Sequence, residues 1–213
     1  FYRPNLLNMP LVKSAPRVLE NVSLLPYNTF GIDVSARYFV EINQLQEYIE
    51  LVQAGQYAHV KHLFLGGGSN LLLTQNVDAL VVKIQMNGIE VLEEDEDHVW
   101  VKAGAGVVWH DFVCYAVEHQ WAGIENMSLI PGTVGAAPMQ NIGAYGVEIK
   151  DTFDHLDALN LTTMQMERFD AARCAFGYRE SYFKHAGKGQ YLITAVCFRL
   201  NKQVQAQTSY GAI

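Results

Sequence analysis

Three consecutive glycines, followed by a serine and an asparagine, stand at residues 66–70 and are the most chemically informative stretch of the chain. They follow the apolar run at residues 62–65, which is typical of a short strand. Consecutive glycines allow positive φ and bring backbone N–H groups close to an anion, and Ser69 and Asn70 add side-chain donors. The loop therefore predicts a phosphate or diphosphate site, although a glycine-rich turn without a ligand stays open. It lacks the spacing of a P-loop and of a dinucleotide fingerprint.

A second stretch, IPGTVGAAPMQNIGAYG at residues 130–146, combines small residues with two prolines. The prolines fix φ, and the small residues leave space beside the chain. Gln140, Asn141 and Tyr145 supply polar groups. Because the stretch has neither strand nor helix periodicity, it would be unusually long for a purely structural loop. It predicts a wall for a flat, partly apolar ligand with a diphosphate tail, such as a nucleotide cofactor.

A third stretch, FGYRESYFK at residues 176–184, places Arg179 between a tyrosine and a glutamate. The planar guanidinium of arginine holds a carboxylate through two hydrogen bonds, or stabilises negative charge that develops on one. A surface arginine paired with Glu180 or another nearby acid is the alternative. The seven histidines and three cysteines show no metal-ligand spacing, so no metal site is predicted.

The composition excludes several classes of protein. The chain has 213 residues, of which 50% are hydrophobic and 17% charged, with a net charge of −7. This is enough apolar material for a sizeable core, and no basic stripe points to nucleic acid. No apolar run reaches ten residues, so we expect no membrane insertion. Cys114, Cys174 and Cys197 are odd in number and scattered, which favours a reducing, cytoplasmic location. The sequence does not indicate an oligomeric state.

The elements that position these residues are predicted as two consecutive α+β units. Residues 1–26 are expected to be loop-like, and the acidic run at residues 93–97 to be a hairpin tip. A helix is expected from an N-cap at Asn43 to about residue 53, with Gln46 at its third position and Leu45, Ile49 and Val52 on one face. Further helices are expected at residues 107–120 and 169–175. Strands are expected at residues 36–42, 62–65, 79–84, 88–93, 98–103, 154–161 and 191–199.

These motifs together resemble one known family, the UDP-N-acetylenolpyruvoylglucosamine reductases (MurB). The glycine loop, the stretch at residues 130–146 and the FGYRES element occur in the family's order, as do NTFGI at residues 28–32 and TSYG at residues 208–211. The resemblance implies a two-subdomain FAD-binding fold of the vanillyl-alcohol-oxidase (PCMH) type. It also implies FAD as cofactor, NADPH as reductant, and reduction of UDP-N-acetylglucosamine enolpyruvate to UDP-N-acetylmuramate in peptidoglycan synthesis.

The resemblance assigns a role to each motif. Arg179 is expected to be catalytic, stabilising the enolate-like intermediate through the substrate carboxylate. Substrate contacts are expected from Tyr145, Tyr178 and Tyr210. The residues expected to bind FAD are Gly66, Gly67, Gly68, Ser69, Asn70, Leu71, Ile130, Pro131, Gly132, Gly135, Ala136, Asn141, Gly143, Tyr145 and Ile193.

The chain also departs from the family's pattern. The family has a C-terminal substrate-binding domain that supplies a proton-donating serine, and the sequence stops where that domain is expected to begin. We therefore expect a chain cut at both ends and inactive alone. Expected divisions are residues 1–23 (extension), 24–86 and 87–203 (FAD-binding subdomains) and 204–213 (start of the third domain). Ala136 replaces a serine found beside the flavin in some members.

Two alternatives remain at this point. One is another FAD oxidoreductase of the same fold that acts on a different substrate. The other is a non-catalytic module that binds FAD or a nucleotide.

Overall fold

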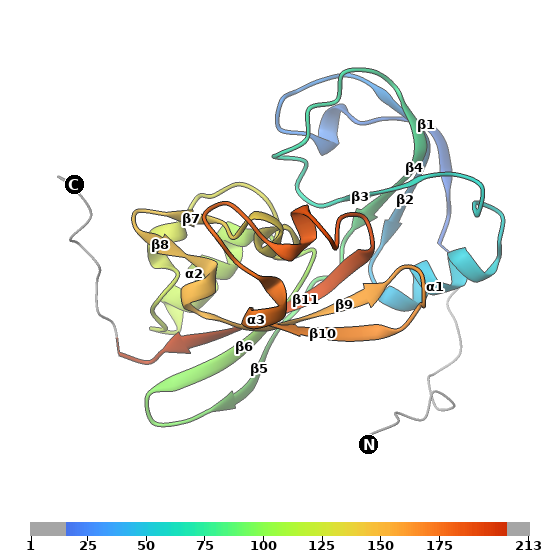
Figure 1. Ribbon diagram of the computed structural model, residues 1–213. Coiled ribbons are helices and arrows are strands. Elements are labelled where there is room, and N and C mark those ends of the chain that lie inside the picture. Colours follow the sequence, from blue (N-terminus) through green and yellow to red (C-terminus); the bar gives the residue numbers. More distant parts are fainter. Residues whose placement is uncertain (1–15, 204–213) are drawn as a thin grey trace.

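The computed structural model describes residues 16–203, whose strands form two large sheets and one short two-stranded ribbon (Figure 1). The first sheet has the order β1-β2-β4-β3. Its strands are β1 (Leu19–Ser23), β2 (Ser35–Ile42), β3 (His62–Leu65) and β4 (Val77–Ile84). β2 and β3 both run parallel to β4, whereas β1 is antiparallel to β2. The parallel pairs require a crossover, which α1 (Leu45–Gln53) provides between β2 and β3.

Two expectations for this region are corrected. Residues 19–23 were expected to be loop-like and to lie in an extension, but they form β1 and pair with β2. The N-cap of α1 is Gln44, one residue later than expected, because Glu47 closes a capping box on it. The side chains that α1 buries are Tyr48 and Leu51, while Leu45 and Val52 are partly buried beside them.

The second sheet is antiparallel throughout and has the order β10-β9-β11-β6-β5. Its strands are β5 (Ile89–Glu94), β6 (His98–Gly104), β9 (Phe153–Asn160), β10 (Met166–Asp170) and β11 (Tyr191–Asn201). The acidic run forms the tip between β5 and β6, as expected, and Asp95 accepts the backbone N–H groups of Asp97 and His98. β10 was not expected, since its sequence lacks a clear alternation of apolar and polar residues.

One face of the second sheet is covered by α2 (Trp109–Glu118), α3 (Ala171–Cys174) and irregular chain. α2 is shorter at both ends than the expected helix at residues 107–120. The covering chain includes the short elements η3 (Glu125–Met127), η4 (Val134–Gln140), β7 (Gly143–Ala144), β8 (Val147–Glu148), η5 (Ile149–Asp151) and η6 (Tyr182–Lys184). Figure 1 shows β7, β8 and α2 gathered on this side of the sheet. Trp109, Phe112 and Phe198 form the centre of this core.

The two sheets share a hydrophobic cluster. Leu80 and Val82 of β4 lie in one cluster with Ala105, Leu159 and Leu192 of the second half. The mixed content confirms the predicted α+β class. Within residues 16–203, no helix has both the length and the apolar character needed to cross a membrane.

Candidate functional site

A cavity of about 630 Å³ lies where the two halves meet, and all three motifs contribute to it. Its volume is within the range of small-molecule and cofactor sites. The glycine loop after β3 contributes two residues, the stretch around η4 contributes most of the wall, and the segment before and in η6 contributes two cations. The lining residues are Ser69, Asn70, Trp109, Ile130, Pro131, Gly132, Thr133, Ala136, Ala137, Met139, Gln140, Ile142, Gly143, Ala144, Arg179 and Lys184.

The glycine loop presents unpaired backbone donors. Among the described residues, no acceptor is bonded to the backbone N–H of Gly67, Gly68, Ser69 or Asn70. Buried backbone N–H groups are nearly always paired in proteins, so a run of open donors beside a cavity is suited to an anion. Lys83 on β4 donates from Nζ to the carbonyl oxygen of Gly66 at 2.7 Å, which places a cation behind the loop. Burial lowers the pKa of the Lys83 ammonium.

The same glycines are also required by packing. A Cβ on Gly67 would lie 2.9 Å from the Cα of Gly132, so the loop and the η4 stretch meet through their backbones. Gly68 has φ of +64°, and a Cβ there would collide with the carbonyl group of Tyr27. The backbone N–H of Thr29 donates to the oxygen of Gly68 at 3.2 Å. The structural and the ligand-binding interpretations of this loop are therefore compatible.

The η4 stretch is held by hydrogen bonds to the chain between β6 and α2. Gly135 donates to the oxygen of Ala105 at 3.0 Å, and the N–H of Trp109 donates to the oxygen of Gly132 at 3.0 Å. At its end, Asn141 adopts φ of +44° and is fully buried. Its side-chain amide donates to the oxygen of Gly177 at 2.9 Å and accepts from the N–H of Lys150. Asn141 therefore ties the second motif to the third.

Arg179 lies at the tip of a tight turn. Gly177 and Glu180 exchange two backbone hydrogen bonds, of 3.0 and 3.2 Å, which leaves Tyr178 and Arg179 between them. Arg179 has φ of +54°, a left-handed conformation that costs about 1 kcal/mol for a residue other than glycine. Its Nη2 donates to the oxygen of Gly143 at 3.2 Å, across the cavity wall.

The acid next to Arg179 is not its partner. Glu180 pairs with His185 and Lys184, and the hydrogen bonds from these two side chains lower the pKa of the Glu180 carboxyl. Within the described part of the chain, no ion pair involves Arg179. The alternative of a surface arginine paired with Glu180 is therefore wrong, and the guanidinium retains donors for a ligand.

Eight of the 18 predicted site residues line the cavity. Those that line it are Ser69, Asn70, Ile130, Pro131, Gly132, Ala136, Gly143 and Arg179. Gly66 and Gly67 pack against lining residues, whereas Gly68 packs against Tyr27 and Gly135 against Ala105. Tyr145 and Tyr178 are exposed, at 54% and 84%. Leu71 packs on the first half, and Ile193 is buried in the core of the second half, so neither lines the cavity. Tyr210 and the TSYG motif lie outside the described residues.

Sequence reasoning missed several lining residues. Trp109 falls in the helix expected at residues 107–120 and was not assigned to the ligand site, yet it borders the cavity from α2. Lys184 ends the stretch at residues 176–184 but was not assigned to the site, and no local signal shows that its ammonium lies against the Arg179 turn. The other missed residues, Thr133, Ala137, Met139, Ile142 and Ala144, belong to the stretch that had already been recognised. Gln140, which was named as a polar group of that stretch, lines the cavity.

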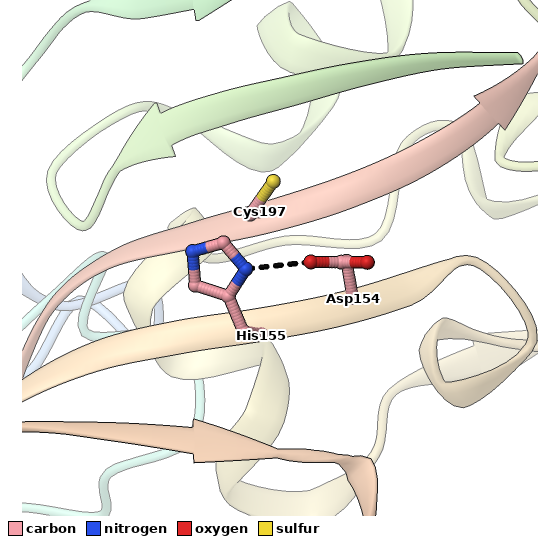
Figure 2. A group of neighbouring side chains, drawn as sticks. All are labelled: Asp154, His155 and Cys197. Atoms are coloured by element: carbon pink, nitrogen blue, oxygen red, sulfur yellow. Dashed lines mark hydrogen bonds and ion pairs between the residues drawn. The ribbon is translucent and has the colours of Figure 1, made fainter. Parts of the chain in front are cut away.

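A second group of chemically active side chains lies away from this cavity (Figure 2). Asp154 and His155 of β9 and Cys197 of β11 each offer one potential metal ligand, and these atoms lie within 4.8 Å of one another. Cys197 pairs with His155, and a bulge at Asp154 turns its side chain toward the same face. Spacing along the sequence cannot show such cross-strand neighbours. Nδ1 of His155 is 2.6 Å from Asp154, and burial raises the pKa of Cys197 to about 12, so a protonated thiol lies beside a hydrogen-bonded pair.

Comparisons with known proteins place the chain in a family. A family described as the FAD binding domain matches residues 36–168, more than half of the chain. The UDP-N-acetylenolpyruvoylglucosamine reductase of Flavobacterium johnsoniae is 47% identical over 197 residues, which are 92% of this chain and 58% of that protein. The corresponding reductase of Burkholderia ambifaria is 47% identical over 96% of this chain and 59% of its own length. The chain thus spans less than two thirds of these curated relatives.

Solved structures confirm the predicted fold type. The MurB reductase of Thermus caldophilus superposes with a TM-score of 0.71 at 24% identity, covering 89% of this chain and 64% of that one. Cholesterol oxidase from B. sterolicum superposes with a TM-score of 0.60 at 16% identity, covering 92% of this chain and 40% of that one. The sequence match, the shared two-sheet fold and a cavity bordered by open backbone donors all lead to one assignment: the chain belongs to the FAD binding domain family.

Proposed function

We propose that the protein binds FAD in the cavity and reduces UDP-N-acetylglucosamine enolpyruvate to UDP-N-acetylmuramate, with NADPH as reductant, in peptidoglycan precursor synthesis. The identity to the named reductases supports the reaction. The observation that carries the proposal is the position of Arg179, whose guanidinium has no ion pair among the described residues and lines the same cavity as the glycine loop with its open N–H groups. A cytoplasmic location fits the three free thiols.

The residues present fit FAD in two ways. The open N–H groups from Gly67 to Asn70, with Lys83 behind them, suit the diphosphate. Ile130, Pro131 and Ala136 give a wall of apolar and small side chains that suits a flat ring system. When bound, FAD supplies the hydride-transfer chemistry, and the protein contributes orientation and electrostatics.

Arg179 binds and polarises the substrate. Its guanidinium forms a bidentate pair with the enolpyruvyl carboxylate, which gains negative charge as hydride reaches the neighbouring double bond. The Gly177–Glu180 turn holds this charge at the cavity before the reaction begins. Ser181 is not suited to donate the final proton, because it is buried and its hydroxyl donates to the oxygen of Met139 at 2.6 Å.

The test is a titration of the FAD-loaded protein followed by flavin absorbance. We expect UDP-N-acetylglucosamine enolpyruvate to perturb the spectrum, and UDP-N-acetylglucosamine, which lacks the carboxylate, to bind more weakly. Arg179→Ala should remove the difference between the two ligands. Equal binding of both ligands to the unmodified protein would contradict the proposed role of Arg179.

The strongest alternative is an FAD oxidoreductase of the same fold with another substrate. The likeness to cholesterol oxidase supports this alternative only in that the two proteins share a fold. That alternative predicts flavin binding without any spectral response to the UDP-sugar. The same titration therefore separates the two functions. A non-catalytic module would show binding without reduction by NADPH.

A further inference from the structure

Lys184 makes the closest side-chain contact to the backbone of the Arg179 turn. Its Nζ donates to the carbonyl oxygen of Arg179 at 2.7 Å and to Oε1 of Glu180 at 3.1 Å. Lys184 is the last residue of η6, which follows the turn directly. The ammonium of Lys184 therefore binds both the backbone of Arg179 and the acidic side chain that follows it.

The contact opposes the relaxation that Arg179 would otherwise undergo. Arg179 has φ of +54°, and a nonglycine residue gains stability by rotating to negative φ. Such a rotation would reorient the peptide group that follows Arg179, and its carbonyl oxygen would leave the ammonium of Lys184. A charge-assisted hydrogen bond to this oxygen therefore favours the left-handed conformation that aims the guanidinium at the oxygen of Gly143.

Other contacts hold the ends of the turn but not its tip. Asn141 binds the oxygen of Gly177, and Ser181 binds the oxygen of Met139. Both contacts fix where the turn begins and ends. Among residues 16–203, the only side chain bonded to the backbone of Arg179 is that of Lys184.

From this arrangement we propose that Lys184 is a positioning residue for Arg179, anchored in turn by Glu180. The inference rests on the proposed function, because Arg179 is the residue that would bind the substrate carboxylate. Lys184 also lines the cavity, so a direct contact with substrate is the competing role. The two roles differ kinetically: loss of a residue that orients a transition-state charge lowers kcat, whereas loss of a ground-state contact raises KM.

The test uses the FAD-loaded full-length protein with Lys184→Met, and Lys188→Met as the matched control. Lys188 is an exposed lysine of the same segment, and its side chain has no hydrogen bond or ion pair within the described residues. We expect Lys184→Met to lower kcat at least tenfold, with a smaller rise in KM for the UDP-sugar and with FAD affinity nearly unchanged. Lys184→Arg should restore part of kcat, and Glu180→Gln should lower kcat by a smaller factor. Lys188→Met should behave as the unmodified protein.

Amide hydrogen exchange gives a readout that does not depend on activity. The N–H groups of Gly177 and Glu180 are bonded to each other's carbonyl oxygens, so their exchange reports whether the turn is intact. We expect Lys184→Met to speed exchange at residues 177–180 and to leave residues 66–70 unchanged. Unchanged exchange in the turn, unchanged kcat, or a rise in KM alone would overturn the inference. If the unmodified protein does not reduce the UDP-sugar, the proposed function fails, while the exchange result still decides whether Lys184 holds the turn.

Discussion

The glycine loop at residues 66–70 and the turn at residues 177–180 border the same cavity but are built in opposite ways. The loop has no side chain at three positions, packs backbone against backbone, and leaves successive N–H groups open. The turn uses side chains to satisfy its backbone, and it leaves one guanidinium available. Backbone donors in a row suit a ligand group of several equivalent oxygens, such as a diphosphate. A single placed cation suits one carboxylate whose charge changes during a reaction.

The largest expected effect comes from removing the guanidinium. In the full-length protein, Arg179→Ala should lower kcat/KM for the UDP-sugar by about 100-fold or more, the usual loss when a placed electrostatic donor is removed from an active site. FAD affinity should stay within a factor of about two, because the backbone donors of the loop are untouched. Stopped-flow kinetics and flavin titration measure the two quantities. Arg199→Ala, at an exposed arginine of β11, is the control. A comparable loss of FAD affinity in Arg179→Ala would contradict the proposal that the loop binds FAD while the turn binds the substrate.

The converse change alters the loop and should remove FAD first. Gly68→Ala adds a Cβ at φ of +64° and against the carbonyl group of Tyr27, so we expect the free energy of unfolding to fall by at least about 2 kcal/mol and FAD affinity to fall at least tenfold. Gly55→Ala isolates the backbone contribution, because Gly55 has φ of +70° and open space around it. It should cost about 1 kcal/mol and leave FAD bound. Chemical denaturation and fluorescence titration measure both variants, and equal losses in the two would show that the contact with Tyr27 is unimportant.

Lys83 links the loop to pH. Burial lowers the pKa of the Lys83 ammonium in the folded protein. Between the folded and the unfolded pKa, the unfolded chain therefore binds more protons than the folded chain. The stability of the protein without FAD should rise with pH through that window. FAD affinity should fall over the same window, as the ammonium behind Gly66 loses its charge. Lys83→Met should weaken FAD binding about tenfold and abolish both slopes. Lys61→Met, at an exposed lysine beside β3, is the control. Slopes that persist in Lys83→Met would assign them to another group.

The smallest effect concerns the turn at acid pH. The carboxyl pKa of Glu180 is lowered by His185 and then by Lys184. A depressed carboxyl pKa contributes stability that is present above the unfolded pKa and is lost as pH falls through the folded value. As pH falls, kcat should therefore stay constant through the ordinary range of glutamate pKa values and decline only below it, with FAD still bound. In Glu180→Gln this acid limb should be absent from the kcat profile; its persistence would place the titrating group elsewhere.

The strands and the cavity motifs were predictable from the sequence to different degrees. β3 and the loop after it were found because an apolar run ends in glycines, a signal that lies within a few residues. β1 and β10 were missed, since each forms through pairing with a neighbouring strand and lacks strong local alternation. The cap of α1 was misplaced by one residue because both candidates are polar and only Glu47 decides between them.

The candidate functional residues show the same contrast between local sequence signals and contacts made by distant segments. Arg179 stood out because its neighbours form a distinctive motif. The partners of Arg179 could not be predicted, since sequence adjacency favours Glu180 whereas the turn geometry sends the guanidinium to Gly143 and gives Glu180 to Lys184. The glycines were assigned to a ligand, but their contact with Gly132 depends on how two distant segments pack. Ile193 lies in a strand core that no local pattern separates from a cavity wall.

The backbone contact between Gly67 and Gly132 joins a loop of the first sheet to a segment packed on the second. A ligand held by both segments acts as a noncovalent cross-link between the two halves of the chain. By mass action, FAD that binds only the folded protein adds about 2.7 kcal/mol of stability when its concentration is 100 times Kd. The melting temperature of this protein should therefore rise with the concentration of FAD. In a cell, the fraction of the protein that is folded, and with it the abundance of the protein, should follow the supply of flavin.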